Sequence, residues 1–465
     1  MIDFERIEEY NENNRIEAKR ALGGLPRSIW ETYSAFANSF GGILLLGVEE
    51  MEDGTFRMVD LPAPEKLIAE FWEILGDRGK VSGNILSKED VEIHEVNGSR
   101  MISITVPRAG RRERPVYIGN NPYLGSYRRD GEGDYHCTRE EVRMMLRDRE
   151  ERTMDEKLLP HLAEEVFVAE TVRRYRAYLK DRNPGHGYGA EPQDRLLCRI
   201  GAAGYGKDGQ AHPTAAGLLM FGYEDEIVKE YPYFTLDYQE RGRDGQLRER
   251  IVSNSGKWSG NLFDFYLRIS GKIVRGLPGD THRPVREAVA NCMVNGDYMG
   301  YGGLTIIKKA DEICVTNPGS FRMDILEAVN GGKSDPRNTR IAKLFHLVKV
   351  GTRTGKGVPD MYRVWKRNGW RMPEIQERLK PDRITFKLPL EAVGPGSQEQ
   401  EPILGMQEDK DALLDYVTWA IYVNAKEAGE ELGISGQEAE AALMQMAQEG
   451  ILVKAQGRDG YRLKI

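Results

Sequence analysis

The sequence is short of cysteine and has no long hydrophobic run. Its 465 residues include four cysteines, which lie far apart in the chain: Cys137, Cys198, Cys292 and Cys314. This spacing suits neither a zinc finger nor a disulfide framework, so it favours a reducing compartment. The apolar run Ile43–Val48 is far shorter than the roughly 20 residues that span a bilayer, and the acidic start Met1–Glu5 lacks a signal-peptide core. We therefore expect a cytoplasmic protein that does not insert into a membrane.

The chain also lacks a strong excess of either charge. Its 66 lysines and arginines stand against 73 aspartates and glutamates, which gives a formal net charge of −7. This balance argues against a histone-like coat for nucleic acid but is compatible with local basic patches. Hydrophobic residues make up 40% of the chain, too many for a disordered protein. At roughly 150 residues per domain, the length predicts about three folded parts.

A complete phosphate-binding P-loop is missing from the sequence. Gly201–Lys207 matches the first seven positions of a Walker A loop. Asp208 then stands where a Ser or Thr must hold magnesium, and Gln210–Pro213 replaces the helix whose N-terminus completes the phosphate site. We interpret the segment as a surface turn, and we do not expect a P-loop helicase motor.

Helix and strand patterns alternate over residues 1–150 and again over residues 151–390. Ser28–Phe40 and Val285–Asn295 show the apolar spacing of helices. Two strand patterns flank Asn97-Gly98, which is a strong hairpin signal. Residues 391–405 are rich in glycine, proline, glutamine and acid, as a linker is. The expected fold class is α+β, in a chain of three parts.

Residues 406–465 have the pattern of a winged helix-turn-helix. Three predicted helices precede two predicted strands, in the order Asp411–Tyr422, Asn424–Leu432, Gly436–Glu449, Ile451–Ala455 and Gly460–Lys464. The third helix contains no lysine or arginine, whereas phosphate contacts dominate affinity for duplex DNA. DNA binding and protein interaction, including homodimerisation, therefore both stay open for this part.

Carboxylates near the N-terminus form the first candidate site. Glu12 and Glu17 are five residues apart, and Glu50 follows the buried strand that begins at Ile43. Three such carboxylates could converge on a divalent metal ion while Lys19 stabilises a phosphate, which is an arrangement that cleaves phosphodiesters. The alternative is that Glu12 and Glu17 lie on the solvated start of a helix.

This pattern resembles the Schlafen AlbA-like domain, also called the divergent AAA domain, over roughly residues 1–145. The matching features are Glu12, Glu17 and Lys19, then Ala37-Asn38, Gly41-Gly42 and Gly47-Val48. Some Schlafen proteins are RNA endonucleases that use two glutamates and an acid at the strand end, which here is Glu50 in place of Asp. Most bacterial members are described as DNA-binding proteins or transcriptional regulators. The resemblance implies nucleic-acid binding and, as an alternative, metal-dependent cleavage.

Six arginines form a second candidate site, for nucleic acid: Arg108, Arg111, Arg112, Arg114, Arg128 and Arg129. The first four lie in one loop, and the last two follow Tyr123 and Tyr127. Arginines beside aromatic rings suit phosphate contacts and base stacking. Interleaved acids such as Glu113 leave a plain solvated loop as the alternative.

A third candidate site centres on a predicted helix. Glu287 and Asn291 are four residues apart, so they lie on one face of that helix. The glutamate could polarise a water molecule while the asparagine reaches a magnesium ion. Gly355 and Gly357 would allow backbone to approach phosphates closely.

With Asp297-Tyr298, Asn317-Pro318-Gly319 and Arg337-Asn338, these residues resemble the RecG C-terminal-like module, which has a GHKL (gyrase, chaperone, histidine kinase) ATP-binding fold. The resemblance implies ATP with Mg²⁺ as cofactor, Asn291 as the metal ligand and Glu287 as the general base. It places Asn317 and Gly319 at the adenine. GHKL enzymes carry Asp where this chain has Asn317, so we expect slow or absent hydrolysis.

Together these patterns predict a transcriptional regulator that binds nucleic acid and responds to ATP or another nucleotide. Two alternatives stay open. One is a metal-dependent endonuclease, and the other is an interaction scaffold with a dead nucleotide pocket.

Overall fold

The computed structural model describes residues 13, 15–131, 133–183, 185, 187–188, 191–323, 325–330, 334–351, 357–392, 424–426, 435–448, 452–454 and 461–463. Residues 151–398 form one compact unit, and residues 1–150 group with residues 399–465 in the other. Both units mix helices and strands, which confirms the predicted α+β class. Among the described residues, no helix is long and apolar enough to cross a membrane, and all four cysteines are free thiols.

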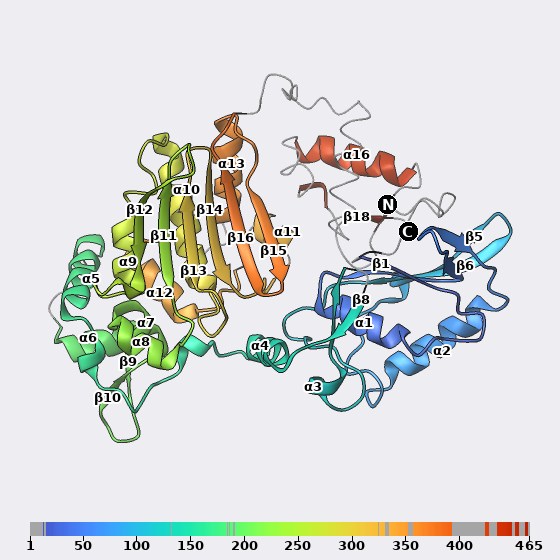
Figure 1. Ribbon diagram of the computed structural model, residues 1–465, viewed down its shortest axis with the longest axis horizontal. Coiled ribbons are helices and arrows are strands. Elements are labelled where there is room, and N and C mark those ends of the chain that lie inside the picture. Colours follow the sequence, from blue (N-terminus) through green and yellow to red (C-terminus); the bar gives the residue numbers. More distant parts are fainter. Residues whose placement is uncertain are drawn as a thin grey trace. The chain divides into compact units, whose positions relative to one another are not determined.

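The N-terminal domain, residues 13–150, contains a four-stranded sheet in the order β1-β2-β6-β5. Helices α1 and α2 lie together on one face of this sheet (Figure 1), where Tyr33, Phe36 and Phe71 pack against Leu44 and Ile104. The elements are β1 (Ile16–Lys19), α1 (Ile29–Asn38), β2 (Gly42–Leu46), β3 (Val48–Glu50), β4 (Phe56–Met58), α2 (Pro64–Gly76), β5 (Val91–Val96), β6 (Ser99–Val106), α3 (Pro122–Gly125), β7 (Tyr127–Asp130), β8 (Gly133–His136) and α4 (Arg139–Arg149).

Two glycine turns set the strand order of this domain. Gly41 lies between α1 and β2 with φ +76°, and a Cβ there would lie 2.8 Å from the carbonyl oxygen of Val106, so only glycine lets the start of β2 approach β6 so closely. Asn97 and Gly98 both have positive φ, 53° and 78°. This is the geometry of a type I′ turn, and it confirms the predicted hairpin of β5 and β6.

The central domain, residues 151–392, contains a six-stranded sheet in the order β12-β11-β13-β14-β16-β15. Helices α9, α10, α12 and α13 lie on one face of this sheet (Figure 1). The elements are α5 (Ala169–Arg182), α6 (Gln193–Ile200), β9 (Ala203–Tyr205), β10 (Ala211–Pro213), α7 (Ala215–Phe221), α8 (Glu224–Glu230), β11 (Leu236–Arg241), β12 (Leu247–Val252), α9 (Leu262–Ile269), α10 (His282–Asn295), β13 (Leu304–Lys308), β14 (Glu312–Pro318), α11 (Ile325–Asn330), α12 (Thr339–Leu347), α13 (Gly357–Arg367), β15 (Glu374–Leu379) and β16 (Asp382–Pro389).

The Walker-like segment is a short hairpin. Gly201 caps α6 with φ +91°, and Ala203–Tyr205 pair with Ala211–Pro213. The next helix after α6 begins only at Ala215, beyond this hairpin. The turn lies at residues 206–210, while residues 203–205 form strand β9, which the sequence did not predict. The geometry of a P-loop is therefore not formed.

The C-terminal segment is described in pieces. Its helix α16 (Gly436–Gln448) precedes the antiparallel strands β17 (Leu452–Lys454) and β18 (Tyr461–Leu463). The Tyr461 hydroxyl donates to Glu440 Oε1 at 2.9 Å, which ties β18 to α16. The predicted helix 411–422 and residues 427–432 of the second lie outside the described residues, so the winged helix stays a prediction.

Candidate functional site

A pocket of about 360 Å³ lies in the central domain, between α10, α12, α13 and the strands β14 and β16. Its volume is within the range of small-molecule sites, which is roughly 300–1,000 Å³. Four predicted site residues line it: Glu287, Asn291, Asn317 and Gly357. Gly319 is not among the lining residues, and Gly355 lies outside the described residues. The structure thus brings these four residues of the third predicted site together from three separate segments, α10, β14 and α13.

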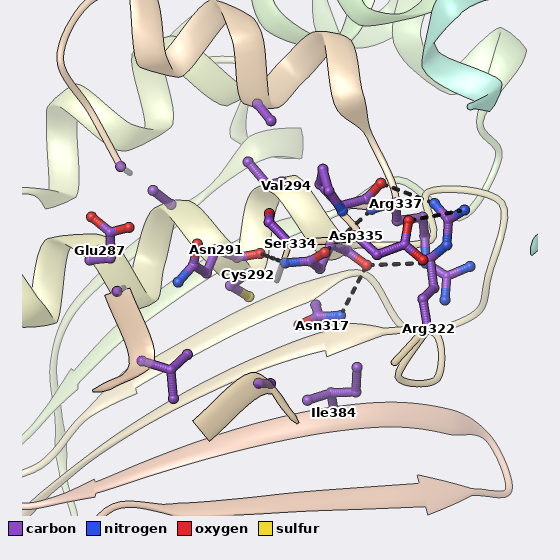
Figure 2. Close-up of a pocket in the computed structure, with 18 of the residues that line it drawn as sticks. Glu287, Asn291, Cys292, Val294, Asn317, Arg322, Ser334, Asp335, Arg337 and Ile384 are labelled. Carbon is purple, nitrogen blue, oxygen red and sulfur yellow. Dashed lines mark hydrogen bonds and ion pairs between the residues drawn. The ribbon is translucent and has the colours of Figure 1, made fainter. Parts of the chain in front are cut away.

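Glu287 and Asn291 lie one helical turn apart on α10 and face the pocket (Figure 2). Glu287 is only 6% exposed. It packs against the first residue of α13, because a Cβ built on Gly357 would lie 2.6 Å from Glu287 Oε1. Glycine at position 357 therefore allows the carboxyl group and the N-terminus of α13 to occupy the same end of the pocket.

The C-terminus of α10 receives its caps from distant residues. The last carbonyls of a helix have no partner within it, and α10 has no basic residue in its last turn. The Tyr298 hydroxyl donates to Met293 O at 2.6 Å, and Asn338 Nδ2 donates to Val294 O at 3.0 Å and to Gly296 O at 2.8 Å. Arg337 Nε donates to Asn295 O at 3.2 Å. The Asp-Tyr and Arg-Asn motifs of the sequence therefore hold the pocket wall together.

Asn317 serves the same cap and also offers an acceptor. Its Nδ2 donates to Pro318 O at 3.0 Å and to Asn295 O at 3.4 Å. Because both donors point at carbonyls, Oδ1 is the amide atom left for a ligand, and no described residue donates to it. Oδ1 can accept a hydrogen bond from an exocyclic amine, as the Asp of a GHKL enzyme does, but without that residue's charge.

Gly319 makes room for an arginine. Its φ is +104°, and a Cβ there would lie 3.2 Å from three atoms of the Arg337 guanidinium group. The predicted contact between Gly319 and adenine is therefore not supported, since this residue packs against Arg337 and does not line the pocket. The close packing against Arg337 and the left-handed backbone conformation explain why position 319 is a glycine.

A cluster of charged residues lies at the far end of the pocket. Arg322, Asp335 and Arg337 gather there, opposite Glu287 (Figure 2). Arg322 Nη2 is 3.8 Å from Asp335 Oδ1, and its Nη1 donates to Pro336 O at 3.0 Å. Arg337 was visible in the Arg-Asn motif, whereas no sequence signal marked Arg322 or Asp335.

The residues fit a nucleotide with a magnesium ion. Asn291 and Glu287 supply the oxygen ligands that Mg²⁺ prefers. The N-terminus of α13 offers the positive end of the helix dipole to phosphates. The Oδ1 atom of Asn317 supplies the acceptor for a base. When bound, a nucleotide would supply a hydrolysable phosphoanhydride, and Glu287 and the start of α13 lie at the same end of the pocket that would receive it.

Among the described residues of the N-terminal domain, the predicted metal ligands Glu17 and Glu50 do not come together as a metal site. Glu17 is 8% exposed and is neutralised by two cations: Lys19 Nζ lies 2.6 Å from its Oε1, and Arg129 Nη1 lies 2.8 Å from its Oε2. Glu50 is an exposed residue at the end of β3, and Glu12 lies outside the described residues. Among the described residues, no group of three histidines, cysteines or acids could hold a metal ion. We derive no metal chemistry from this site.

The six predicted nucleic-acid arginines separate into two groups. Arg114, Arg128 and Arg129 are at most 4% exposed. Arg129 bridges Glu17 and Asp134, 3.0 Å from the latter, and Arg128 lies 3.4 Å from Glu141. Such burial does not suit direct contact with phosphate, so these three support the fold.

The other three arginines lie nearer to solvent. Arg112 is exposed, and Arg108 and Arg111 are half-buried. The guanidinium group of Arg108 lies 6.0 Å from the centroid of the Phe40 ring. Arg111 Nη1 donates to Asp148 O at 2.7 Å, which fixes the loop on the end of α4. The solvent-accessible part of the predicted interface is therefore smaller than the sequence suggested.

Comparison with protein families identifies the parts of the chain. The family "Schlafen, AlbA_2" matches residues 12–138, and the family "Putative ATP-dependent DNA helicase recG C-terminal" matches residues 304–386. A domain of unknown function matches residues 143–237. A search of curated proteins found no match.

Two solved structures are similar to the chain. The crystal structure of the DIP2311 protein from Corynebacterium diphtheriae is 18% identical, covers 97% of this chain and 79% of that chain, and has a TM-score of 0.42. The second is the solution NMR structure of the N-terminal domain of a "Putative ATP-dependent DNA Helicase RecG-related Protein" from Nitrosomonas europaea. It is 30% identical, covers 28% of this chain and 88% of that chain, and has a TM-score of 0.22. By the family matches, residues 12–138 belong to the Schlafen AlbA_2 family and residues 304–386 to the RecG C-terminal family.

Proposed function

We propose that this protein binds nucleic acid and that a nucleotide bound in the central pocket regulates this binding, as in a transcriptional regulator. The observation that carries the proposal is the convergence of Glu287, Asn291, Asn317 and Gly357 on one pocket of about 360 Å³. The matched families, Schlafen AlbA_2 and the RecG C-terminal module, support a nucleic-acid-associated, ATPase-like protein.

The pocket favours binding over rapid turnover. Glu287 is buried against Gly357, and the uncharged Asn317 replaces the aspartate of GHKL enzymes. A neutral acceptor holds an amine less strongly than a carboxylate does, because hydrogen bonds to charged groups are roughly twice as strong. A nucleotide that is bound and hydrolysed slowly suits a switch better than a motor.

Titration calorimetry with ATP, ADP and a non-hydrolysable analogue, each with Mg²⁺, tests the nucleotide site. We expect heat with at least one of them, and weaker magnesium-dependent binding after Asn291→Ala. Arg283→Ala is the matched control, because Arg283 lies on the same helix, is exposed and does not line the pocket. Absence of heat with all three nucleotides, in a folded sample, would favour the scaffold with a dead pocket.

Regulation is tested by measuring nucleic-acid affinity with and without the nucleotide. Coupling between two sites usually changes affinity about 5- to 150-fold, and it is reciprocal. We expect fluorescence anisotropy with labelled DNA or RNA to show such a change, and calorimetry to show the same factor for the nucleotide. Equal affinities in both states would refute regulation while leaving both binding activities intact.

The nuclease alternative has weaker support. Its central carboxylate, Glu17, already has Lys19 and Arg129 as partners. A divalent ion would have to displace both cations from a site that is only 8% exposed, and removing one partner of a buried ion pair costs about 3–5 kcal/mol.

A further inference from the structure

Helix α4 carries arginines at regular intervals on one side. Arg139, Arg143 and Arg147 are four residues apart, so they follow one face of the helix at intervals of about 6 Å along its axis. The opposite side packs inward, where Val142 and Met145 are buried. Arg139 and Arg143 are exposed, and Arg147 is half-buried. We call these three residues the α4 arginine stripe.

The stripe joins the basic loop at the C-terminal end of the helix. Arg111 Nη1 donates to Asp148 O at 2.7 Å and to Glu150 O at 3.2 Å, and these carbonyls belong to a helix end that needs donors. Arg149 lies between the two carbonyls in sequence, and Arg112 follows Arg111 directly. Both are exposed. Arg111 therefore holds the basic loop against the C-terminal end of α4, and we call the loop and the helix together the basic surface.

This surface is basic in an acidic chain. Without the buried Arg114 and Asp148, the segments 108–114 and 139–149 contain seven arginines and three acids, a net charge of +4, whereas the whole chain carries −7. Within the part of the chain that the structure describes, Arg112, Arg139 and Arg149 have no carboxylate partner. Unpaired exposed cations hold counterions that a polyanion can displace, and this release drives binding to nucleic acid.

Most acids in these segments either accept hydrogen bonds from the backbone or are buried. Glu141 accepts from the Thr138 backbone amide at 2.6 Å, Asp148 is 6% exposed, and Glu113 accepts from Gly110 N at 2.8 Å. Glu140 alone among them lies inside the stripe, 3.9 Å from Arg143 and 3.5 Å from Arg147. Glu140 is thus the residue that limits the positive potential of the stripe.

We propose that the α4 arginine stripe, together with Arg112 and Arg149, binds the phosphodiester backbone of a nucleic acid. The inference rests on the proposed function, in which the chain binds nucleic acid. The stripe is about 12 Å long, which matches three to four phosphates of one B-form strand. Guanidinium groups pair with phosphate oxygens in a bidentate manner. Phosphate contacts carry no base information, so this surface binds without sequence preference.

The test compares two triple variants of the full chain by anisotropy across a salt titration, with single-stranded DNA, duplex DNA and single-stranded RNA as separate probes. Arg139→Gln, Arg143→Gln and Arg147→Gln together should lower the slope of log K against log salt by about two to three. The control combines Arg27→Gln, Lys66→Gln and Arg78→Gln, three exposed cations of the same domain outside this surface, and should leave the slope unchanged. Calorimetry checks that both variants are folded.

A gain-of-function variant makes the test independent of folding. Glu140→Gln removes the one acid inside the stripe, so it should tighten binding and raise the slope by up to about one. Misfolding cannot produce such a gain. Unchanged binding by both the triple variant and Glu140→Gln would overturn the inference.

Two further outcomes separate this inference from the proposed function. If the wild type binds none of the three probes at low salt, the proposed function fails, and this inference fails with it. If the wild type binds and only the loop variant Arg108→Gln with Arg112→Gln weakens binding, the proposed function stands and the role of α4 is refuted. The same variants are also tested for binding to phosphatidylserine vesicles. If the triple variant of the stripe loses vesicle binding but binds all three nucleic acids as the wild type does, the inference is overturned and the stripe is assigned to a membrane surface.

Discussion

Gly357→Ala places a methyl group against the buried side chain of Glu287. The new Cβ would lie 2.6 Å from Oε1, 2.7 Å from Cγ and 3.0 Å from Cδ of that residue. Real Cβ atoms do not approach other heavy atoms this closely, so the whole carboxyl side chain must rotate. Glu287 is 6% exposed, which leaves it little space to do so.

The expected cost follows from the cost of overpacking, which is about 1–3 kcal/mol for an extra methyl group in a packed site. In a domain of this size, 1 kcal/mol lowers the melting temperature by about 2–4 °C. Scanning calorimetry should therefore show a fall of roughly 2–12 °C for the transition of the central domain. Gly271→Ala is the matched control, because a Cβ at position 271 meets no heavy atom within 4 Å.

The double variant decides whether Glu287 is the cause. Glu287→Ala removes the three atoms that the new methyl group would meet, so Gly357→Ala should then cost less than about 0.5 kcal/mol. The difference between the two backgrounds is a coupling energy, which for residues in contact is about 0.5–3 kcal/mol. Equal costs in both backgrounds would refute the reasoning and with it the contact between Glu287 and the start of α13.

Three further outcomes concern buried polar groups. Burial raises the pKa of Asp155 from 3.8 to about 6. The contribution of this group to the free energy of unfolding is therefore complete below pH 3.8, and it falls by about 3 kcal/mol as the pH rises through 6. Asp155→Asn should remove this dependence in calorimetry between pH 4 and 7. Arg129→Gln should destabilise the N-terminal domain by about 3–5 kcal/mol, since it leaves the buried Glu17 and the half-buried Asp134 with one cation fewer, whereas the exposed Arg20→Gln should cost under 1 kcal/mol in urea unfolding. Asn338→Ala should cost about 1–3 kcal/mol per α10 carbonyl left unsatisfied, and a change under 0.5 kcal/mol would contradict its role as a cap.

Local patterns in the sequence predicted the elements well. The helix expected at Ser28–Phe40 is α1, and the one expected at Val285–Asn295 is the larger part of α10. The Asn97-Gly98 turn joins β5 and β6 as expected. These signals succeed because helix periodicity and turn chemistry depend on residues close together in the chain.

Motif spacing also placed Glu287 and Asn291 on one helical face, and the resemblance brought Asn317 and Gly357 to the same pocket. Neither source revealed that Asn317, Arg337 and Asn338 cap the end of α10. A cap of this kind joins segments that are remote in sequence, so no local pattern encodes it.

The sequence by itself determined the class of the fold, the motifs and the charges, but tertiary structure decided which charges are available. Glu17, Arg128 and Arg129 look equally suited to a nuclease or to a nucleic-acid surface when read in sequence. In the folded chain they are buried, and Glu17 and Arg129 neutralise each other. Arg112, Arg139 and Arg149 remain exposed without a carboxylate partner in the described residues. The reason is physical: burying a charge costs free energy that an opposite charge beside it must offset, and of the two partners of Glu17 only Lys19 lies on β1, whereas Arg129 comes from strand β7, far along the chain.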